Sequence, residues 1–152
     1  MNDIRKLNMA ISIANNSEFY TNAGRTIRVG AVIYKGNRII STGNNSRKEH
    51  PVMQEYNKQM PFHRKPFLHA EVAALLACRW KQDLHGATIC IARCLNNGGY
   101  GMARPCPACL KAIADAGISK IIYTTDYGYA VEYINSEKYF NYRVKFDFPQ
   151  KK

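Results

Sequence analysis

The stretch from residue 69 to residue 124, HAEVAALLACRWKQDLHGATICIARCLNNGGYGMARPCPACLKAIADAGISKIIYT, decides the fold. Residues 70–79 and 106–116 are rich in helix formers, and Gly117 follows the second run as a stop signal. Residues 87–92 and 121–124 are short apolar runs typical of buried strands. Strands separated by helices need crossover connections, which place helices on the faces of a sheet. The stretch therefore predicts an α/β fold.

The flanking segments add further elements to this arrangement. Apolar residues at helical spacing predict an amphipathic helix over residues 3–19. Residues 27–34 and 38–42 are β-rich runs joined by Lys-Gly-Asn, which predicts a hairpin. A long basic loop follows, with room for a short helix near residues 53–58. Alternating apolar and polar residues over 142–148 predict a strand near the end of an aromatic-rich tail. Taken together, the hairpin and the strands separated by helices predict a mixed sheet.

Length and composition indicate a globular protein. The chain has 152 residues, of which 46% are hydrophobic and 22% charged, which suits one domain spanning residues 1–152. We see neither a secretory leader nor about 18 consecutive apolar residues. We therefore expect a cytoplasmic protein with no membrane segment.

The cysteines point to metal binding rather than to disulfides. Their number is five, which is odd, and two of them form a C-x-x-C pair. Cys78, Cys90 and Cys94 lie in or beside apolar runs, so we expect them to be reduced and mostly buried thiols.

The charge balance points to an anionic partner. The chain carries 22 Lys and Arg against 11 Asp and Glu, a net charge of +11. A nucleotide phosphate and a nucleic-acid backbone both fit this balance. The basic residues form no continuous block, so many of them are also explained as ordinary solvated surface.

Two short motifs supply the side chains of a catalytic zinc site. His69 and Glu71 begin the first helix of the stretch, while Cys106 and Cys109 begin the second, within the run PCPAC. One imidazole and two thiolates provide three ligands and leave the fourth tetrahedral position for water. Alone, H-A-E is more typical of a helix cap, and C-x-x-C of a redox pair or zinc knuckle. Together, with a strand between them, they favour a metal site.

The pattern H-x-E followed by P-C-x-x-C resembles the cytidine and deoxycytidylate deaminase superfamily. Pro105 and residues 112–118 are most similar to the branch that contains the deoxycytidylate and tRNA adenosine deaminases. The resemblance implies a three-layer α/β/α sandwich with a central mixed sheet of about five strands. It also implies one Zn²⁺ per chain, bound by His69, Cys106 and Cys109, and a homo-oligomer.

The chemistry implied by the motif is hydrolytic deamination. Zinc coordination lowers the pKa of a bound water to about 7. Glu71 would then carry the proton of that water to the ring nitrogen and to the departing amine.

Five further residues are substrate-binding candidates. The resemblance implies that Asn45 contacts the sugar, that the Ala70 N–H holds the base carbonyl and that the Pro105 carbonyl receives the leaving amine. Tyr127 lies where related enzymes often place an aromatic side chain over the base, although with ten tyrosines in the chain structural packing is the favoured explanation. Arg104, directly before Pro105, fits either a bidentate phosphate contact or a salt bridge that holds the loop.

Three functions are compatible with the sequence. The first is deamination of a cytosine nucleotide, and the leading hypothesis is conversion of dCMP to dUMP and ammonia. The second is deamination of a base in a polynucleotide, either cytosine in single-stranded DNA or adenosine in RNA, because the chain is basic and has aromatic residues among its cations. The third is a non-catalytic zinc module that binds nucleic acid, for which Glu71 would be superfluous.

Overall fold

The computed structural model describes residues 1–17, 27–61, 67–78, 83–134 and, for the backbone, 142–147. No helix among these residues has the length and apolar character needed to cross a membrane. The elements in chain order are α1 (Asp3–Asn15), β1 (Arg28–Lys35), β2 (Arg38–Asn44), α2 (Pro51–Lys58), α3 (Ala70–Ala77), β3 (Thr88–Cys94), β4 (Tyr100–Gly101), α4 (Pro107–Asp115), β5 (Lys120–Thr125), β6 (Gly128–Ile134) and β7 (Tyr142–Asp147).

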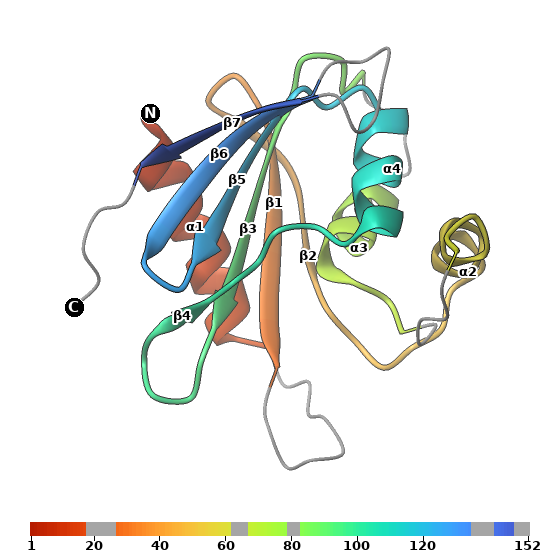
Figure 1. The fold of residues 1–152 in the computed structure, drawn as a ribbon, viewed down its shortest axis with the longest axis horizontal. Helices are drawn as coiled ribbons and strands as arrows, with labels where there is room; N and C mark the ends of the chain where they lie inside the picture. Colours follow the sequence, from red (N-terminus) through yellow and green to blue (C-terminus); the bar gives the residue numbers. More distant parts are fainter. Residues whose placement is uncertain (18–26, 62–66, 79–82, 135–141, 148–152) are drawn as a thin grey trace.

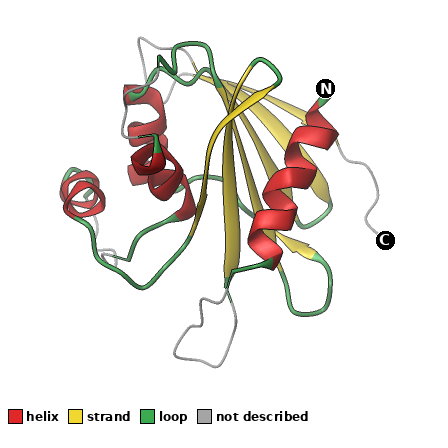
Figure 2. Cartoon of the chain, turned by 180° about the vertical axis from the view of Figure 1, so that it is seen from behind, coloured by secondary structure: helices red, strands yellow, loops and turns green. Residues whose placement is uncertain are grey.

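The strands of the described residues form one mixed sheet between two helical layers. Six strands follow the order β2-β1-β3-β5-β6-β7, and the short β4 pairs with β3. Only the β3–β5 pair is parallel among these strands. α1 covers one face, while α3 and α4, with α2 beside α4, lie on the other (Figures 1 and 2). The predicted three-layer sandwich is confirmed, with more strands than the expected five or so.

Strand side chains alternate between two hydrophobic clusters. Ala31 and Ile33 of β1 pack in the cluster that includes α3 and α4, whereas Val32 and Tyr34 pack in the cluster that includes α1. The same alternation holds in β3, because successive side chains of a strand point to opposite faces. The centre of the sheet, at β1 and β3, is therefore buried on both sides.

The structure differs from the sequence prediction at several elements. β6 was expected only as part of an aromatic-rich tail, because Glu132 interrupts its apolar pattern. β4 has only two residues, too few for a recognisable period. The first helix ends at Asn15, earlier than expected, while the short helix predicted near residues 53–58 is present as α2. The strand predicted at the C-terminal end is β7.

Two glycines allow helices to approach opposite faces of the sheet. A Cβ atom on Gly30 would lie 2.5 Å from the backbone nitrogen of Ala14 in α1. A Cβ atom on Gly43 would lie 2.6 Å from the carbonyl oxygen of Ala70 and would also clash with the backbone nitrogen of Ala74 in α3. These separations are too short for any larger residue unless the helix moves. Gly43 thus sets the distance of α3 from β2.

Candidate metal centre

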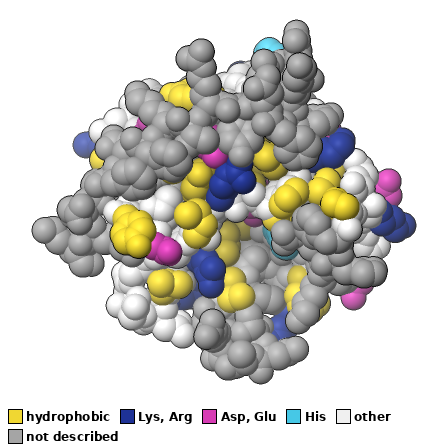
Figure 3. Space-filling model, in the orientation of Figure 1, with side chains coloured by type: hydrophobic (Ala, Val, Ile, Leu, Met, Phe, Trp, Pro, Cys, Tyr) yellow, Lys and Arg dark blue, Asp and Glu magenta, His cyan; other side chains and the backbone are white. Residues whose placement is uncertain are grey.

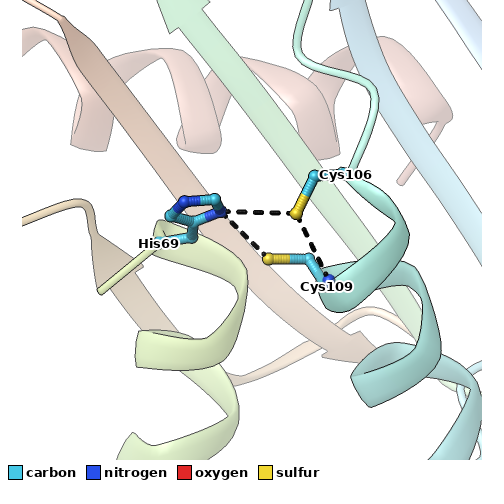
Figure 4. Close-up of side chains that lie close together, drawn as sticks. All are labelled: His69, Cys106 and Cys109. Atoms are coloured by element: carbon cyan, nitrogen blue, oxygen red, sulfur yellow. Dashed lines mark hydrogen bonds between the residues drawn. The ribbon is translucent and has the colours of Figure 1, made fainter. Parts of the chain in front are cut away.

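The two halves of the sequence motif meet at the starts of two helices. His69 is the residue preceding α3, and Cys106 is the N-cap of α4. Cys109 lies in the first turn of α4 and is fully buried. Figure 4 shows the imidazole of His69 directed at both cysteine side chains. Residues 37 and 40 positions apart in the sequence are thereby brought into contact.

The separations between the ligand atoms fit a tetrahedral zinc site. Nδ1 of His69 lies 3.6 Å from Sγ of Cys106 and 3.2 Å from Sγ of Cys109. All three ligand atoms lie within 4.8 Å of one another. Usual zinc–nitrogen and zinc–sulfur bond lengths at tetrahedral angles place such nitrogen and sulfur atoms about 3.6 Å apart. One nitrogen and two sulfur donors are also the ligand types that zinc prefers.

The environment of Cys106 favours its thiolate form. A hydrogen bond with the Cys109 side chain lowers the pKa of Cys106 to about 4; burial opposes this shift, and hydrogen bonding to His69 adds to it. The backbone N–H of Cys109 also donates to Sγ of Cys106 over 3.4 Å. Metal binding requires a deprotonated thiol, so Cys106 is prepared to act as a ligand.

Glu71 is buried beside these ligands. Only 5% of its surface is exposed, and it lies in the first turn of α3. Burial raises the pKa of Glu71 to about 7; the charge of His69 opposes the shift, and that of Cys106 adds to it. A carboxyl group with a pKa near neutrality can both accept and release a proton, which is what a general acid–base group requires.

The family comparison agrees with this geometry. A model described as the cytidine and deoxycytidylate deaminase zinc-binding region matches residues 2–125. The chain belongs to the cytidine and deoxycytidylate deaminase family. Because the matched region is a zinc-binding one and the three ligand atoms fit zinc, the predicted Zn²⁺ cofactor is supported.

Named relatives of this deaminase chain come from bacteriophages. The deoxycytidylate deaminase of Enterobacteria phage T2 is 30% identical over 141 residues, which cover 66% of this chain and 70% of that protein. The deoxycytidylate deaminase of Mycobacterium phage D29 is 31% identical, with 63% and 77% covered.

Solved structures share the deaminase fold at lower identity. The dCMP deaminase of cyanophage S-TIM5, in complex with dCMP and dUMP, has a TM-score of 0.56 at 22% identity and covers 84% of this chain and 85% of its own. The cytidine deaminase of Burkholderia pseudomallei has a TM-score of 0.58 at 18% identity, with 86% and 91% covered. At these identities, the two structures show that the chain shares their fold.

A short ribbon fixes the start of the deaminase helix α3. The backbone N–H of Ser46 donates to the carbonyl of Leu68, and the N–H of Leu68 donates to that of Lys48. Glu49 and Phe67 form the next bridge. The two strands of this ribbon lie at the two ends of the segment that contains α2. Because the second strand ends directly before His69, the ribbon limits the movement of this ligand.

Thr124 fixes the approach to α4 in a similar way. Its fully buried hydroxyl donates to the carbonyl of Gly101 over 2.8 Å and accepts the backbone N–H of Arg93 over 3.0 Å. Its carbonyl accepts the N–H of Ala103. One side chain thus joins β3, β4 and β5 just before the segment that leads to Cys106. No sequence motif marks Thr124 for this role.

Arg104 pairs with a carboxylate that no sequence pattern indicated. Its Nε lies 3.0 and 3.2 Å from the two carboxylate oxygens of Glu132 in β6. The Glu132 side chain is 3% exposed and that of Arg104 34%. Burial raises the pKa of the neighbouring Tyr123 to about 12, and the charge of Glu132 adds to this shift. Of the two roles considered for Arg104, this geometry favours a salt bridge that holds the loop.

The other substrate-binding candidates lie in different surroundings. Asn45 supports the start of β1: its Oδ1 accepts the Val29 N–H over 3.0 Å, and its Nδ2 donates to the Ile27 carbonyl over 3.0 Å. These bonds give Asn45 a structural role at the start of β1. Tyr127 is 75% exposed, in the turn between β5 and β6. Ala70 and Pro105 are buried next to the ligands His69 and Cys106.

A space-filling view shows the surface of the molecule in the orientation of Figure 1. Figure 3 shows a hollow near the middle of this face, with a histidine side chain at depth. Hydrophobic side chains and separate Lys and Arg side chains border the hollow.

Replacing Arg104 with Met is expected to lower the free energy of unfolding by about 3 kcal/mol, because a buried carboxylate loses its partner. Glu132→Gln should cost less, since the half-exposed arginine can still reach water. Lys111→Met, which breaks a more exposed pair within α4, serves as control and should cost no more than about 0.5 kcal/mol. Urea unfolding measures all three. Equal losses for Arg104→Met and Lys111→Met would contradict the assigned role.

Replacing Gly43 with Ala is expected to displace α3 and lower the free energy of unfolding by about 1–3 kcal/mol. Because His69 directly precedes α3, zinc affinity should fall as well. Gly30→Ala is the matched control: it creates a comparable clash with α1 on the opposite face and should destabilise the fold without weakening zinc binding. Urea unfolding and competition with a chelator measure the two effects. A loss of zinc affinity in both variants would refute the argument.

Proposed function

We propose that this deaminase hydrolyses dCMP to dUMP and ammonia, using one zinc ion per chain. The observation that carries the proposal is the buried Glu71 beside His69, Cys106 and Cys109, at the starts of α3 and α4. Three ligands and one acid–base group are the complement needed for hydrolytic deamination.

The residues of the site have distinct roles in the proposed reaction. His69, Cys106 and Cys109 would hold a zinc ion, which when bound would lower the pKa of a water molecule to about 7. Glu71 takes a proton from the attacking water and passes it to ring N3 of cytosine. Glu71 would then take the second proton from the hydroxyl now on C4 and deliver it to the exocyclic nitrogen, which leaves as ammonia when its bond to C4 breaks. C4 retains the oxygen of water and becomes the carbonyl of uracil.

Backbone groups next to the ligands would orient the base. The N–H of Ala70 is in the first turn of α3, where backbone donors have no partner within the helix. We assign it to the carbonyl oxygen of the cytosine ring. The carbonyl of Pro105 precedes Cys106 and is assigned to the leaving amine. Tyr127, on the exposed β5–β6 turn, is a candidate to cover the base.

Support for dCMP as substrate comes from the relatives. The phage T2 and D29 proteins are named deoxycytidylate deaminases. The S-TIM5 dCMP deaminase was solved with dCMP and dUMP. The net charge of +11 suits an anionic nucleotide. It also suits a polynucleotide, but the two segments where basic and aromatic residues interleave, 62–67 and 139–143, lie largely outside the described residues.

A substrate panel tests this proposal. Ammonia release is measured with dCMP, CMP, deoxycytidine and AMP, and base conversion with a cytosine-containing single-stranded DNA and an adenosine-containing RNA loop. We expect dCMP to react fastest. No turnover of any mononucleotide, together with conversion of an oligonucleotide whose affinity falls steeply with salt, would contradict the proposal. Zinc binding without any turnover would favour the non-catalytic module.

The proposal also covers the cellular location and the oligomeric state of the enzyme. All five cysteines are free thiols, a state that suits the reducing cytoplasm, where nucleotide substrates are available. We place the enzyme there and infer a homo-oligomer from the family resemblance. Light scattering of the purified protein tests the second statement, and a monomeric mass at micromolar concentration would refute it.

A further inference from the structure

A second arginine, Arg93, lies at the end of the sheet that carries the metal centre. It is the penultimate residue of β3, which ends at Cys94. Ile89 and Ile91 of the same strand pack in the cluster of α3 and α4, so alternation places the Arg93 side chain on that face of the sheet. The helices that carry the zinc ligands begin at the same end, because each of them runs antiparallel to β3.

The strand register places Arg93 level with the start of α3. Gly43 of β2 contacts Ala70 in the first turn of α3, and the register through β1 aligns Gly43 with Ile91. Arg93 lies two residues further along β3, in the direction of the start of α3 and of His69, which precedes it. The side chain of Arg93 therefore emerges at the edge of the metal centre rather than at a distant surface.

Glycine in the neighbouring strand leaves room for the Arg93 side chain. Arg93 pairs with Gly101 of β4. A Cβ atom on Gly101 would lie 3.0 Å from Cδ and 3.2 Å from Nε of Arg93, so the arginine extends across the space that this glycine leaves open. β4 continues directly into the segment that reaches Cys106. Arg93 thus lies against the chain that leads to the second half of the metal centre.

The two arginines of this region differ in their partners. Arg104 is paired with the buried Glu132. None of the ion pairs among the described residues involves Arg93, which is only partly buried. A guanidinium without a carboxylate, at the mouth of a site, is suited to a bidentate contact with a phosphate.

We propose that Arg93 binds the 5′-phosphate of the nucleotide and thereby selects a nucleoside monophosphate over the nucleoside. This inference rests on the proposed function, which supplies the nucleotide. It transfers to Arg93 the phosphate contact that the sequence had suggested for Arg104. Arg93 is then a specificity-determining residue, whereas Arg104 positions the loop before Cys106.

Product binding tests the inference independently of turnover. Dissociation constants for dUMP and deoxyuridine are measured by calorimetry with the zinc-loaded wild-type protein and with Arg93→Gln, Arg93→Lys and Arg38→Gln. Arg38 lies at the opposite end of the sheet, on β2, and its replacement removes the same charge. Arg93→Gln should weaken dUMP binding about 10- to 100-fold and leave deoxyuridine unchanged. Arg93→Lys should lose less, and Arg38→Gln should match the wild type.

Two results would overturn the inference. One is an unchanged preference for dUMP over deoxyuridine in Arg93→Gln. The other is an unchanged dUMP affinity combined with weaker binding of a single-stranded oligonucleotide, which would assign Arg93 to a backbone phosphate. Failure of the proposed function is detected in a separate measurement, turnover of dCMP by the wild-type protein. A wild-type protein that binds dUMP but does not convert dCMP would contradict the function and not the role of Arg93 in binding.

Discussion

Glu71→Gln should reduce turnover of dCMP by about 10²- to 10⁴-fold, the usual contribution of a general acid–base group. The amide keeps the shape of the side chain but cannot carry the proton from water to the base. Zinc content should remain at one ion per chain, because Glu71 is not one of the three residues whose ligand atoms converge. Steady-state kinetics and metal analysis of the same preparation measure both quantities.

Stability separates this catalytic effect from misfolding. Glu71 is buried, so its replacement by a neutral amide should not lower the thermal midpoint. Glu55→Gln, an exposed carboxylate on α2, is the matched control and should leave turnover unchanged. A Glu71→Gln enzyme with normal turnover would show that another group moves the proton.

Cys109→Ala should abolish activity by removing a zinc ligand. The binding free energy of a protein zinc site is contributed by three or four ligands. Removing one thiolate should therefore lower zinc affinity on the order of 10³-fold. Cys90→Ala is the matched control, because Cys90 is also fully buried but lies on the α1 face of the sheet. Both variants create a small cavity, and only Cys109→Ala should lose zinc. Competition with a chelator and turnover of dCMP measure the difference.

One outcome for Cys109→Ala would contradict the assignment of Cys109 as a zinc ligand. If the variant retained both zinc and turnover, Cys109 would not be a ligand, and the cluster with His69 would be a packing contact. Equal loss of zinc in Cys90→Ala would indicate instead that the metal site responds to general destabilisation.

The sequence allowed much of this fold to be predicted because local signals and tertiary structure agree. Apolar runs, a hairpin turn and helix stops located β1, β2, α3, β3, α4 and β5 close to their observed bounds. The metal ligands were found because their residue types and spacing form a motif whose parts have few other common uses. Both signals are contained within short segments of chain.

The contacts that support the site could not be predicted in this way. Glu132 looked like an interruption of a strand pattern, because its partner Arg104 lies 28 residues away. Thr124 looked like any strand threonine, although it joins three strands. Asn45 matched a family position, yet its side chain is bonded to the backbone of β1. Such roles depend on which strands become neighbours, and local sequence does not encode that directly.

The most direct test of the account is the product balance with dCMP. Purified protein containing one zinc ion per chain is incubated with dCMP, and dUMP and ammonia are quantified over time. We expect one dUMP and one ammonia for each dCMP consumed, and no reaction after the metal has been removed by a chelator. No conversion of dCMP by the zinc-loaded protein, or an equal rate without the metal, would contradict it.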